Sequence, residues 1–341
     1  MKTTFMKRAL VTGATGHIGR TLCRALGAQG VEVVALVRPG YQGAPLVDVT
    51  VATGDVLDGE SLIAAAHQCD VVFHCAAVFE IHTREPDVLH RTSVEGTRAT
   101  VLAARRAGAK RVVLTSSVAA TGFGDGPEAL LDESNWANDL SVPYYRAKQE
   151  AERVAMQIAA EEGVELVTVL PTLVLGPDDH RVTPSSRFLV DMLRGAGVTI
   201  DGGLNVIDVR DLASAMIEAA RKGRAGARYI LGGENMLVRD FGALVTRVTG
   251  RPVKHVALPR WAMTAAAAAM ELSAAMTGGT PALTRDAVRD VYGKYAWYDV
   301  TRARTELGLT TRPTLDTLRD AAAFFRATKA LPSSTAILEA A

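Results

Sequence analysis

The stretch from Ala9 to Gly19 reads ALVTGATGHIG, an apolar run followed by three glycines at intervals of three residues, Gly13, Gly16 and Gly19. The apolar run predicts a buried strand, and the residues from Ile18 predict the start of a helix. Glycine permits the tight turn between them, lets the backbone approach a ligand closely, and allows the helix to pack on the strand. Because a helix N-terminus also attracts anions, this loop predicts a site for the pyrophosphate of a dinucleotide.

Outward from this loop, short apolar runs alternate with stretches that predict helices. The predicted strands after the first are residues 31–37, 71–75, 112–114, 166–170 and 228–231, and the predicted helices between them are 18–29, 62–67, 88–107 and 143–162. This order is typical of parallel strands joined by helical crossovers. We therefore predict an α/β fold with a Rossmann-type doubly wound parallel sheet.

The second half of the chain has more proline and glycine and a weaker strand pattern. We expect residues 1–175, completed by segments near 204–232, to form the nucleotide-binding domain. Residues 176–203 and 233–330 predict a smaller, mainly helical cap that binds the substrate, with helices near 240–249, 260–276 and 314–327. Residues 331–341 predict a mobile tail.

Composition limits the possible partners. The sequence has 38 basic and 37 acidic residues, so its charge does not favour a nucleic acid or an anionic membrane, and a small molecule is the simpler expectation. Three cysteines without CxxC spacing and the lack of an apolar leader indicate a cytoplasmic protein with reduced thiols. Histidine spacing predicts no metal site.

The alanine- and methionine-rich segment 261–276 is the one stretch that resembles a membrane span. Glu271 interrupts it and Arg260 precedes it, so its uninterrupted apolar run is too short to cross a bilayer. We expect a helix that is buried or faces a partner, and a homodimer is compatible with this expectation.

The strand at 31–37 ends in Arg38, where a binder of NAD would present an acidic residue to the ribose. A guanidinium at this position can bind a 2′-phosphate through two hydrogen bonds. We therefore expect NADP (NADPH) as the cofactor, with NAD less favoured. The alternative is that Arg38 is only a solvated residue at a strand end.

The segment Pro143-Tyr144-Tyr145-Arg146-Ala147-Lys148 opens a predicted helix. Tyr144 and Lys148 are four residues apart and share one helix face, so the ammonium is expected to lower the phenol pKa and make a tuned proton donor. Alone, such a pair is as typical of a helix surface. The strand at 112–114 delivers Thr115, Ser116 and Ser117 to the edge where ligands bind, and a hydroxyl there can hydrogen-bond a reacting oxygen.

The glycine loop, the strand-end serine and the tyrosine–lysine helix, in this order, resemble the extended short-chain dehydrogenase/reductase family. The segments LVRPG, GDVLD, HCAA, SVEGT and DESNW resemble its dihydroflavonol reductase-like branch, while GLNVIDVRDLA and RYILGGEN also resemble hopanoid-associated sugar epimerases. The resemblance implies that Ser117 positions the substrate carbonyl, with Ser116 as the alternative, that Tyr144 transfers the proton, and that Lys148 tunes Tyr144 and binds the nicotinamide ribose.

The resemblance also implies where the cofactor lies. Asp55 and Val56 would follow the adenine, Ala76 and Ala77 the inner ribose and phosphates, and the segment from Pro171 to Leu173 the nicotinamide. Contacts from the glycine loop are expected from Gly13, Thr15, Gly16, His17, Ile18 and Gly19. Ser93, Leu170 and Asp208 depart from residues that many family members carry, which leaves hydride chemistry intact but identifies no particular substrate.

We predict an NADPH-dependent reductase of a ketone or aldehyde, in which Tyr144 protonates the oxygen. An NAD-dependent sugar-nucleotide epimerase or dehydratase is the alternative, and Arg38 argues against it. A regulator that only senses the nucleotide would not need Ser117, Tyr144 and Lys148 together. The substrate pocket is expected to be mostly apolar, which favours a hydrophobic carbonyl compound, and to be lined by Phe79, Ile81, Val174, Arg187, Phe188 and Asn205.

Overall fold

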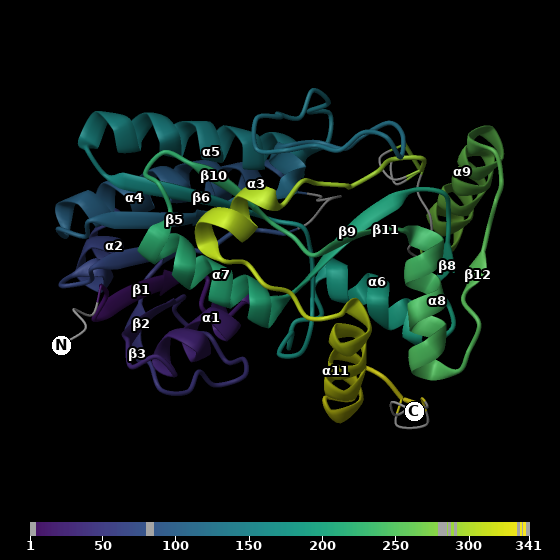
Figure 1. Ribbon diagram of the computed structural model, residues 1–341, viewed down its shortest axis with the longest axis horizontal. Helices are drawn as coiled ribbons and strands as arrows, with labels where there is room; N and C mark the ends of the chain where they lie inside the picture. The colour runs from purple at the N-terminus through teal and green to yellow at the C-terminus, as the bar shows by residue number, and fades with distance from the viewer. Residues whose placement is uncertain are drawn as a thin grey trace.

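Seven parallel strands form the central sheet of the computed structural model, which describes residues 5–79, 85–278, 285, 288–289, 292–332, 335 and 337–338. The strand order is β10-β6-β5-β4-β1-β2-β3. Figure 1 shows this sheet between two layers of helices. The predicted doubly wound α/β fold is confirmed. The strands are β1 (Arg8–Thr12), β2 (Glu32–Val37), β3 (Thr50–Thr53), β4 (Val71–His74), β5 (Arg111–Thr115), β6 (Glu165–Pro171) and β10 (Arg228–Leu231).

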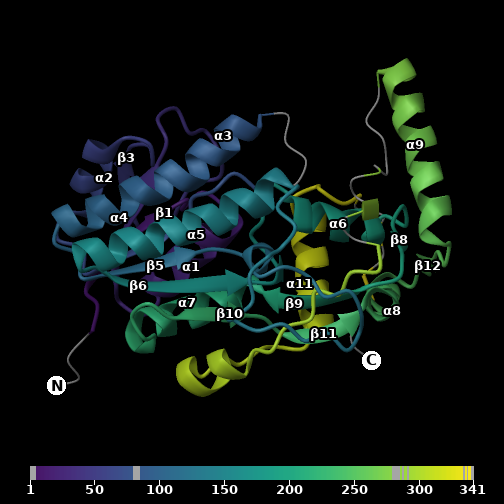
Figure 2. The same ribbon diagram turned by 90° about the horizontal axis from the view of Figure 1, so that it is seen from above.

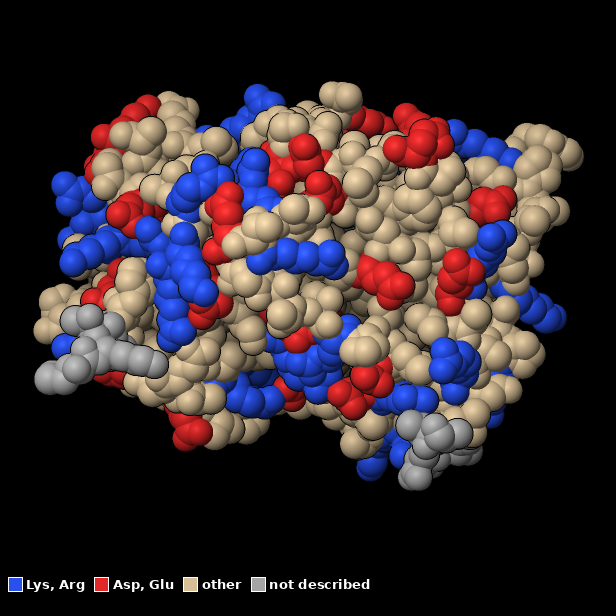
Figure 3. All heavy atoms as spheres, in the orientation of Figure 1, with Lys and Arg blue, Asp and Glu red and all other residues tan. Residues whose placement is uncertain are grey.

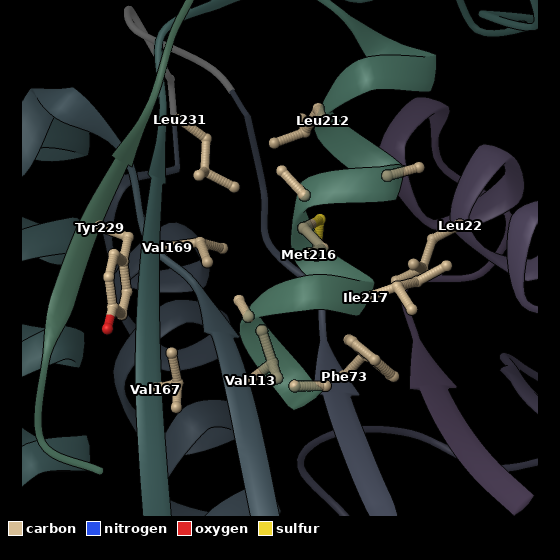
Figure 4. Packing of buried hydrophobic residues seen from close by; sticks show 14 of the residues in the cluster. Leu22, Phe73, Val113, Val167, Val169, Leu212, Met216, Ile217, Tyr229 and Leu231 are labelled. Carbon is tan, nitrogen blue, oxygen red and sulfur yellow. The ribbon is translucent and has the colours of Figure 1, made fainter. Parts of the chain in front are cut away.

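Alternate residues of these strands enter two separate cores, because successive side chains in a strand point to opposite faces. One core contains Phe73, Val113 and Val167 and packs against α1 (His17–Gly27) and α7 (Val209–Lys222), as Figure 4 shows. The opposite core is built by the intervening strand residues, and it packs against α2 (Gly59–Ala66), α4 (Gly96–Arg106) and α5 (Pro143–Glu162).

The connection from β4 to β5 is longer and less regular than the single helix predicted at 88–107. It contains α3 (Pro86–His90), the π-helical turn η1 (Arg91–Glu95) and then α4. After β5 a short 3-10 turn, η2 (Val118–Ala120), precedes the loop to α5.

The C-terminal part of the chain begins where β6 ends, since one residue separates β6 from β7 (Leu173–Leu175). It holds two small sheets, β11-β9-β7 and β12-β8. Figure 2 shows it beside one end of the large sheet, with α9 projecting from it. The further elements are β8 (Val198–Thr199), β9 (Gly203–Asp208), β11 (Glu234–Leu237), β12 (Lys254–His255), α6 (Pro184–Leu193), α8 (Val238–Thr249), α9 (Arg260–Thr277), η3 (Ala303–Leu307) and α11 (Thr314–Ala327).

One expectation for this part needs correction, and of the two placements expected for the helix at 260–276 only the partner-facing one stays a prediction. The last residues are not a free tail where they are described, because Leu331 is buried and the Leu338 N–H donates to the Val248 carbonyl oxygen at 2.7 Å. The helix at 260–276 is mostly exposed, with Trp261 and Met276 about three-quarters accessible (75% and 74%). In the described residues no helix is long and apolar enough to cross a membrane.

Charged side chains are mixed over the surface. On the face drawn in Figure 3, Lys and Arg are interspersed with Asp and Glu, as the near-neutral charge of +1 leads one to expect.

Candidate active site

The glycine loop joins β1 to α1, and its three glycines have different tasks. Gly13 has a φ of +67°, and a Cβ there would lie 2.6 Å from the Ala76 backbone nitrogen. A Cβ on Gly19 would overlap the Gly13 carbonyl. A Cβ on Gly16, by contrast, would meet only the Gly13 carbonyl oxygen, at 3.3 Å. Gly13 and Gly19 therefore let the loop close, while Gly16 keeps its outer side open to a ligand.

The residues present fit a dinucleotide. Helix α1 begins at His17, and the N–H groups of its first turn have no acceptor inside the helix. Strand β2 runs parallel to β1, with Val11 opposite Ala35, so Arg38 follows the end of β2 at the edge that carries the loop. Arg38 is exposed, and its guanidinium bonds to no residue in the part of the chain that the structure describes. An anion can therefore reach it.

The side chain of His17 does not face the loop opening. It is buried and donates from Nε2 to the Pro177 carbonyl oxygen at 2.9 Å. Burial lowers the His17 pKa, so the ring is neutral. Of the loop contacts expected from His17, only its backbone N–H remains available, and its ring instead ties the loop to the segment after β7. The side chain of Ile18 packs against the core, and Thr15 is half-buried in the turn.

The other expected cofactor contacts lie at the ends of neighbouring strands. Asp55 and Val56 follow β3, and the Asp55 carboxylate accepts the Leu57 N–H at 2.9 Å. Ala76 and Ala77 follow β4 and line a small pocket together with Lys148. Pro171 ends β6 and Leu173 begins β7. These contacts stay predictions.

A directional chain of hydrogen bonds fixes the end of β4 behind this pocket. Thr97 donates to the Ser93 carbonyl oxygen at 2.6 Å, so its Oγ1 accepts from Nε2 of His74 at 3.1 Å. Nδ1 of His74 then accepts from Thr12 at 2.8 Å, and Thr12 accepts the Ala76 N–H at 3.3 Å. Burial lowers the His74 pKa to about 3, which agrees with a neutral ring. His74 therefore has a structural role beside the site.

Ser117 and Tyr144 meet at the carboxyl edge of the sheet. Ser117 caps η2, where its Oγ accepts the Ala119 N–H at 3.1 Å, and its hydroxyl lies close enough to the Tyr144 phenol to lower the pKa of that phenol. Tyr144 lies in the first turn of α5, and the Phe79 ring packs on it with 5.2 Å between centroids. The structure thus brings the predicted serine and tyrosine together.

The neighbouring Ser116 points elsewhere. Its hydroxyl donates to Oε2 of Glu152 at 2.7 Å, and both residues are buried. The Ser116 hydroxyl therefore already donates its hydrogen bond inside the protein, and no hydrogen bond among the described residues joins it to Tyr144. Of the two serines that the sequence left open, Ser117 has the geometry to contact a substrate.

Lys148 lies one turn after Tyr144, but its effect on the phenol is not the expected one. Its Nζ donates to the Thr115 carbonyl oxygen at 3.1 Å. Burial raises the pKa of Tyr144 to about 12, and the neighbouring Ser117 hydroxyl opposes this rise. The expected lowering of the phenol pKa is therefore wrong for this structure, because burial of the phenol raises its pKa.

The ammonium of Lys148 is itself desolvated. Burial lowers its pKa to about 8, and the negative forms of Cys75 and Glu152 oppose that shift. Lys148 therefore changes its charge near neutral pH.

A larger pocket lies beside Tyr145, and the sequence did not predict its lining. Its cavity volume is about 250 Å³, and it is partly open to solvent. Its walls come mainly from residues 121–139, between η2 and α5, and from Arg289 and Lys294. The sequence contained one indication of this pocket, because the loop that lines it follows the strand-end serine directly. The lining residues are Thr121, Gly122, Phe123, Asp125, Leu131, Asn135, Trp136, Ala137, Asn138, Asp139, Tyr145, Arg289 and Lys294.

Most residues that were expected to line the pocket lie elsewhere. Phe79 contacts Tyr144, but Val174 is buried in the core and Phe188 stacks on Phe241 with 5.7 Å between centroids. Asn205 is buried and donates to Asn235 at 2.6 Å. Arg187 is exposed on α6, and Ile81 lies outside the described residues. No group of three or more His, Cys, Asp or Glu side chains in the described residues is arranged to hold a metal ion.

Comparison with known proteins identifies the family and several relatives of this chain. Residues 9–232 match the model of the NAD dependent epimerase/dehydratase family. A putative dihydroflavonol 4-reductase of Synechocystis is 34% identical over 324 residues, which cover 93% of this chain and 94% of that protein. Sterol demethylase protein B of Methylococcus capsulatus is 32% identical over 326 residues, which cover 93% and 98%. The crystal structure of gox2253 superposes with a TM-score of 0.82 at 30% identity, covering 95% and 99%.

Proposed function

We propose, because the chain belongs to the NAD-dependent epimerase/dehydratase family of extended short-chain dehydrogenases/reductases, that this NAD(P)-dependent oxidoreductase uses NADPH to reduce a ketone or an aldehyde. The observation that carries the proposal is the position of the Ser117 hydroxyl beside the Tyr144 phenol, at the sheet edge that also holds the glycine loop. Two hydroxyls placed together in this way can bind one carbonyl oxygen.

The proposed chemistry divides between the cofactor and the protein. Bound NADPH would supply the hydride. Ser117 would donate a hydrogen bond to the carbonyl oxygen, and Tyr144 would deliver its phenolic proton to the same atom. A phenol with a pKa of about 12 is protonated at neutral pH, so Tyr144 is in the state that reduction requires. Lys148 would hold the nicotinamide ribose beside it.

The preference for NADPH is supported by Arg38. Its exposed guanidinium follows β2 beside the glycine loop, and no carboxylate in the described part of the chain bonds to it. A 2′-phosphate can therefore form a charge-assisted pair with it.

The pocket beside Tyr145 favours an uncharged substrate. Phe123, Trp136 and Tyr145 give it aromatic walls, and the Phe123 and Tyr145 rings lie 5.5 Å apart. Its basic residues are balanced by acidic ones, because Lys294 pairs with Asp125 and both Lys294 and Arg289 act on the carboxylate of Asp139. A pyrophosphate needs an excess of positive charge, whereas a neutral hydrophobic carbonyl compound does not.

The test is NADPH consumption by the purified protein against a panel of hydrophobic ketones, aldehydes and UDP-sugars. We expect turnover of apolar carbonyl compounds and loss of that turnover in Tyr144→Phe. Conversion of a UDP-sugar to its epimer without net NADPH consumption would overturn the proposal in favour of an epimerase.

A further inference from the structure

A buried carboxylate, Glu152, lies on α5 one turn after Lys148. Its side chain is 0% exposed, and each oxygen has its own partner. Oε2 accepts from Ser116 at 2.7 Å, and Oε1 accepts from Nε of Arg228 at 2.5 Å. Glu152 therefore connects α5 to the end of β5 and to β10.

Arg228 extends this connection to the loop before α5. Its Nη1 donates to the carbonyl oxygens of Glu133 at 2.5 Å and Asn135 at 2.9 Å. Its guanidinium also lies 3.9 Å from the centre of the Trp136 ring. Since Trp136 lines the pocket beside Tyr145, one chain of contacts runs from Glu152 to the wall of the proposed substrate pocket.

The charges around Lys148 give Glu152 a second task. The small pocket that Lys148 lines is also lined by Glu152, which is its only acidic lining residue in the described part of the chain. His74 is a neutral ring there, and Cys75, next to it, is a thiol whose pKa burial raises to about 11. Tyr144 is a neutral phenol. Glu152 is thus the buried carboxylate that interacts with both buried cations, Lys148 and Arg228.

We infer that Glu152 is a positioning residue that holds Ser116 and Arg228 in fixed places and keeps Lys148 charged, so that Lys148 can hold the nicotinamide ribose while Ser117 and Tyr144 act on the carbonyl oxygen. The inference rests on the proposed function for the roles of those three residues. A buried ion pair that served stability alone could be replaced by apolar side chains of similar size without loss. The position of Glu152 beside Lys148 predicts that such a replacement restores stability here but not the pH dependence of NADPH binding.

The test measures the effect of the Lys148 charge on NADPH binding, and it needs no catalytic turnover. The dissociation constant of NADPH is measured against pH by cofactor fluorescence. In the parent protein we expect binding to weaken as the pH rises through about 8, where Lys148 loses its proton. Glu152→Gln should move this weakening to lower pH by roughly one unit, because the opposing charge is lost. Its kcat should fall by about tenfold or more.

Because Glu152→Gln leaves Arg228 buried without its partner, Glu152→Gln/Arg228→Met removes both charges and keeps the fold testable. The double variant should recover thermal stability but keep the shifted binding profile. Glu161→Gln, an exposed change on the same helix, should behave as the parent does. A parental pH profile in the double variant would overturn the inference.

Failure of the proposed function would look different. If Tyr144→Phe kept the parental rate, the catalytic roles proposed for Ser117 and Tyr144 would be wrong. The effect of Glu152 on NADPH binding would still be measured independently, because that experiment needs no substrate.

Discussion

Two loops at the same edge of the sheet offer different groups to a ligand, backbone groups in one loop and side chains in the other. After β1, the glycine loop offers backbone N–H groups, and a side chain on Gly13 would collide with Ala76. After β5, Ser117 reaches Tyr144 through side chains, and a single hydroxyl on each residue makes the contact. Substitutions that add atoms should therefore impair binding at the glycine loop, whereas substitutions that remove atoms should impair the chemistry of Ser117 and Tyr144.

The largest effect should come from removing one oxygen at the second loop. Tyr144→Phe deletes the proposed proton donor, so kcat for a carbonyl substrate should fall by about 10²–10⁴-fold. NADPH affinity should stay within a few fold, as measured by calorimetry, because the ring and its packing on Phe79 remain. Tyr145→Phe should lose much less. Parental turnover by Tyr144→Phe would assign the proton to another group.

Adding atoms at the first loop should come next in size. Gly16→Val fills the open side of the turn, and we expect NADPH to bind roughly 100-fold more weakly, about 2.7 kcal/mol, with an unchanged circular dichroism spectrum. The matched variant Gly13→Ala should instead lower the melting temperature, because the added Cβ meets backbone at a positive φ. Normal binding by a folded Gly16→Val protein would place the dinucleotide elsewhere.

The choice between NADPH and NADH should respond to Arg38. Arg38→Asp replaces a proposed charge-assisted contact by repulsion, so the ratio of the two dissociation constants should change by about 30-fold, near 2 kcal/mol. Fluorescence titration with both nucleotides measures it. Arg239→Asp, an exposed change on α8, serves as the control. Equal affinity of the parent for both nucleotides would remove Arg38 from the cofactor site.

The smallest effect concerns pH. The Lys148 pKa is lowered to about 8, so the residue is charged below that pH and neutral above it. The reductive kcat/KM should therefore fall as the pH rises through about 8, by up to about tenfold per unit. Tyr144, with a pKa of about 12, stays protonated over this range. Lys148→Arg should move the fall to higher pH, and an unchanged profile in that variant would exclude Lys148 as its source.

Several elements could be predicted from the sequence to the residue. Helix α5 begins at Pro143 and ends before Gly163, which has a φ of +68°, because proline suits the first turn of a helix and glycine its end. Strand β3 was missed because it is largely exposed and lacks a buried apolar run. Helix α7 was missed although its apolar residues follow a helical period.

At the site, the sequence located the segments but not the orientations. Ser116 and Ser117 are adjacent and chemically identical, and only the position of Glu152, thirty-six residues after Ser116, separates their roles. The direction of the Tyr144 pKa shift depends on how deeply α5 packs, which four-residue spacing does not encode. The loop at 121–139 carries no periodic pattern, so its pocket needed the structure.

The path of the chain between its sheets limits how this protein can be taken apart. One residue, Thr172, separates β6 from β7, α7 starts directly after β9, and β10 returns to the large sheet before β11 leaves it. A chimera that exchanges the C-terminal part would need matched junctions at all three crossings. A fragment cut after Leu175 would lack both α7 and β10, leaving Val167 and Val169 without their cover, so modular exchange at a single boundary is ruled out.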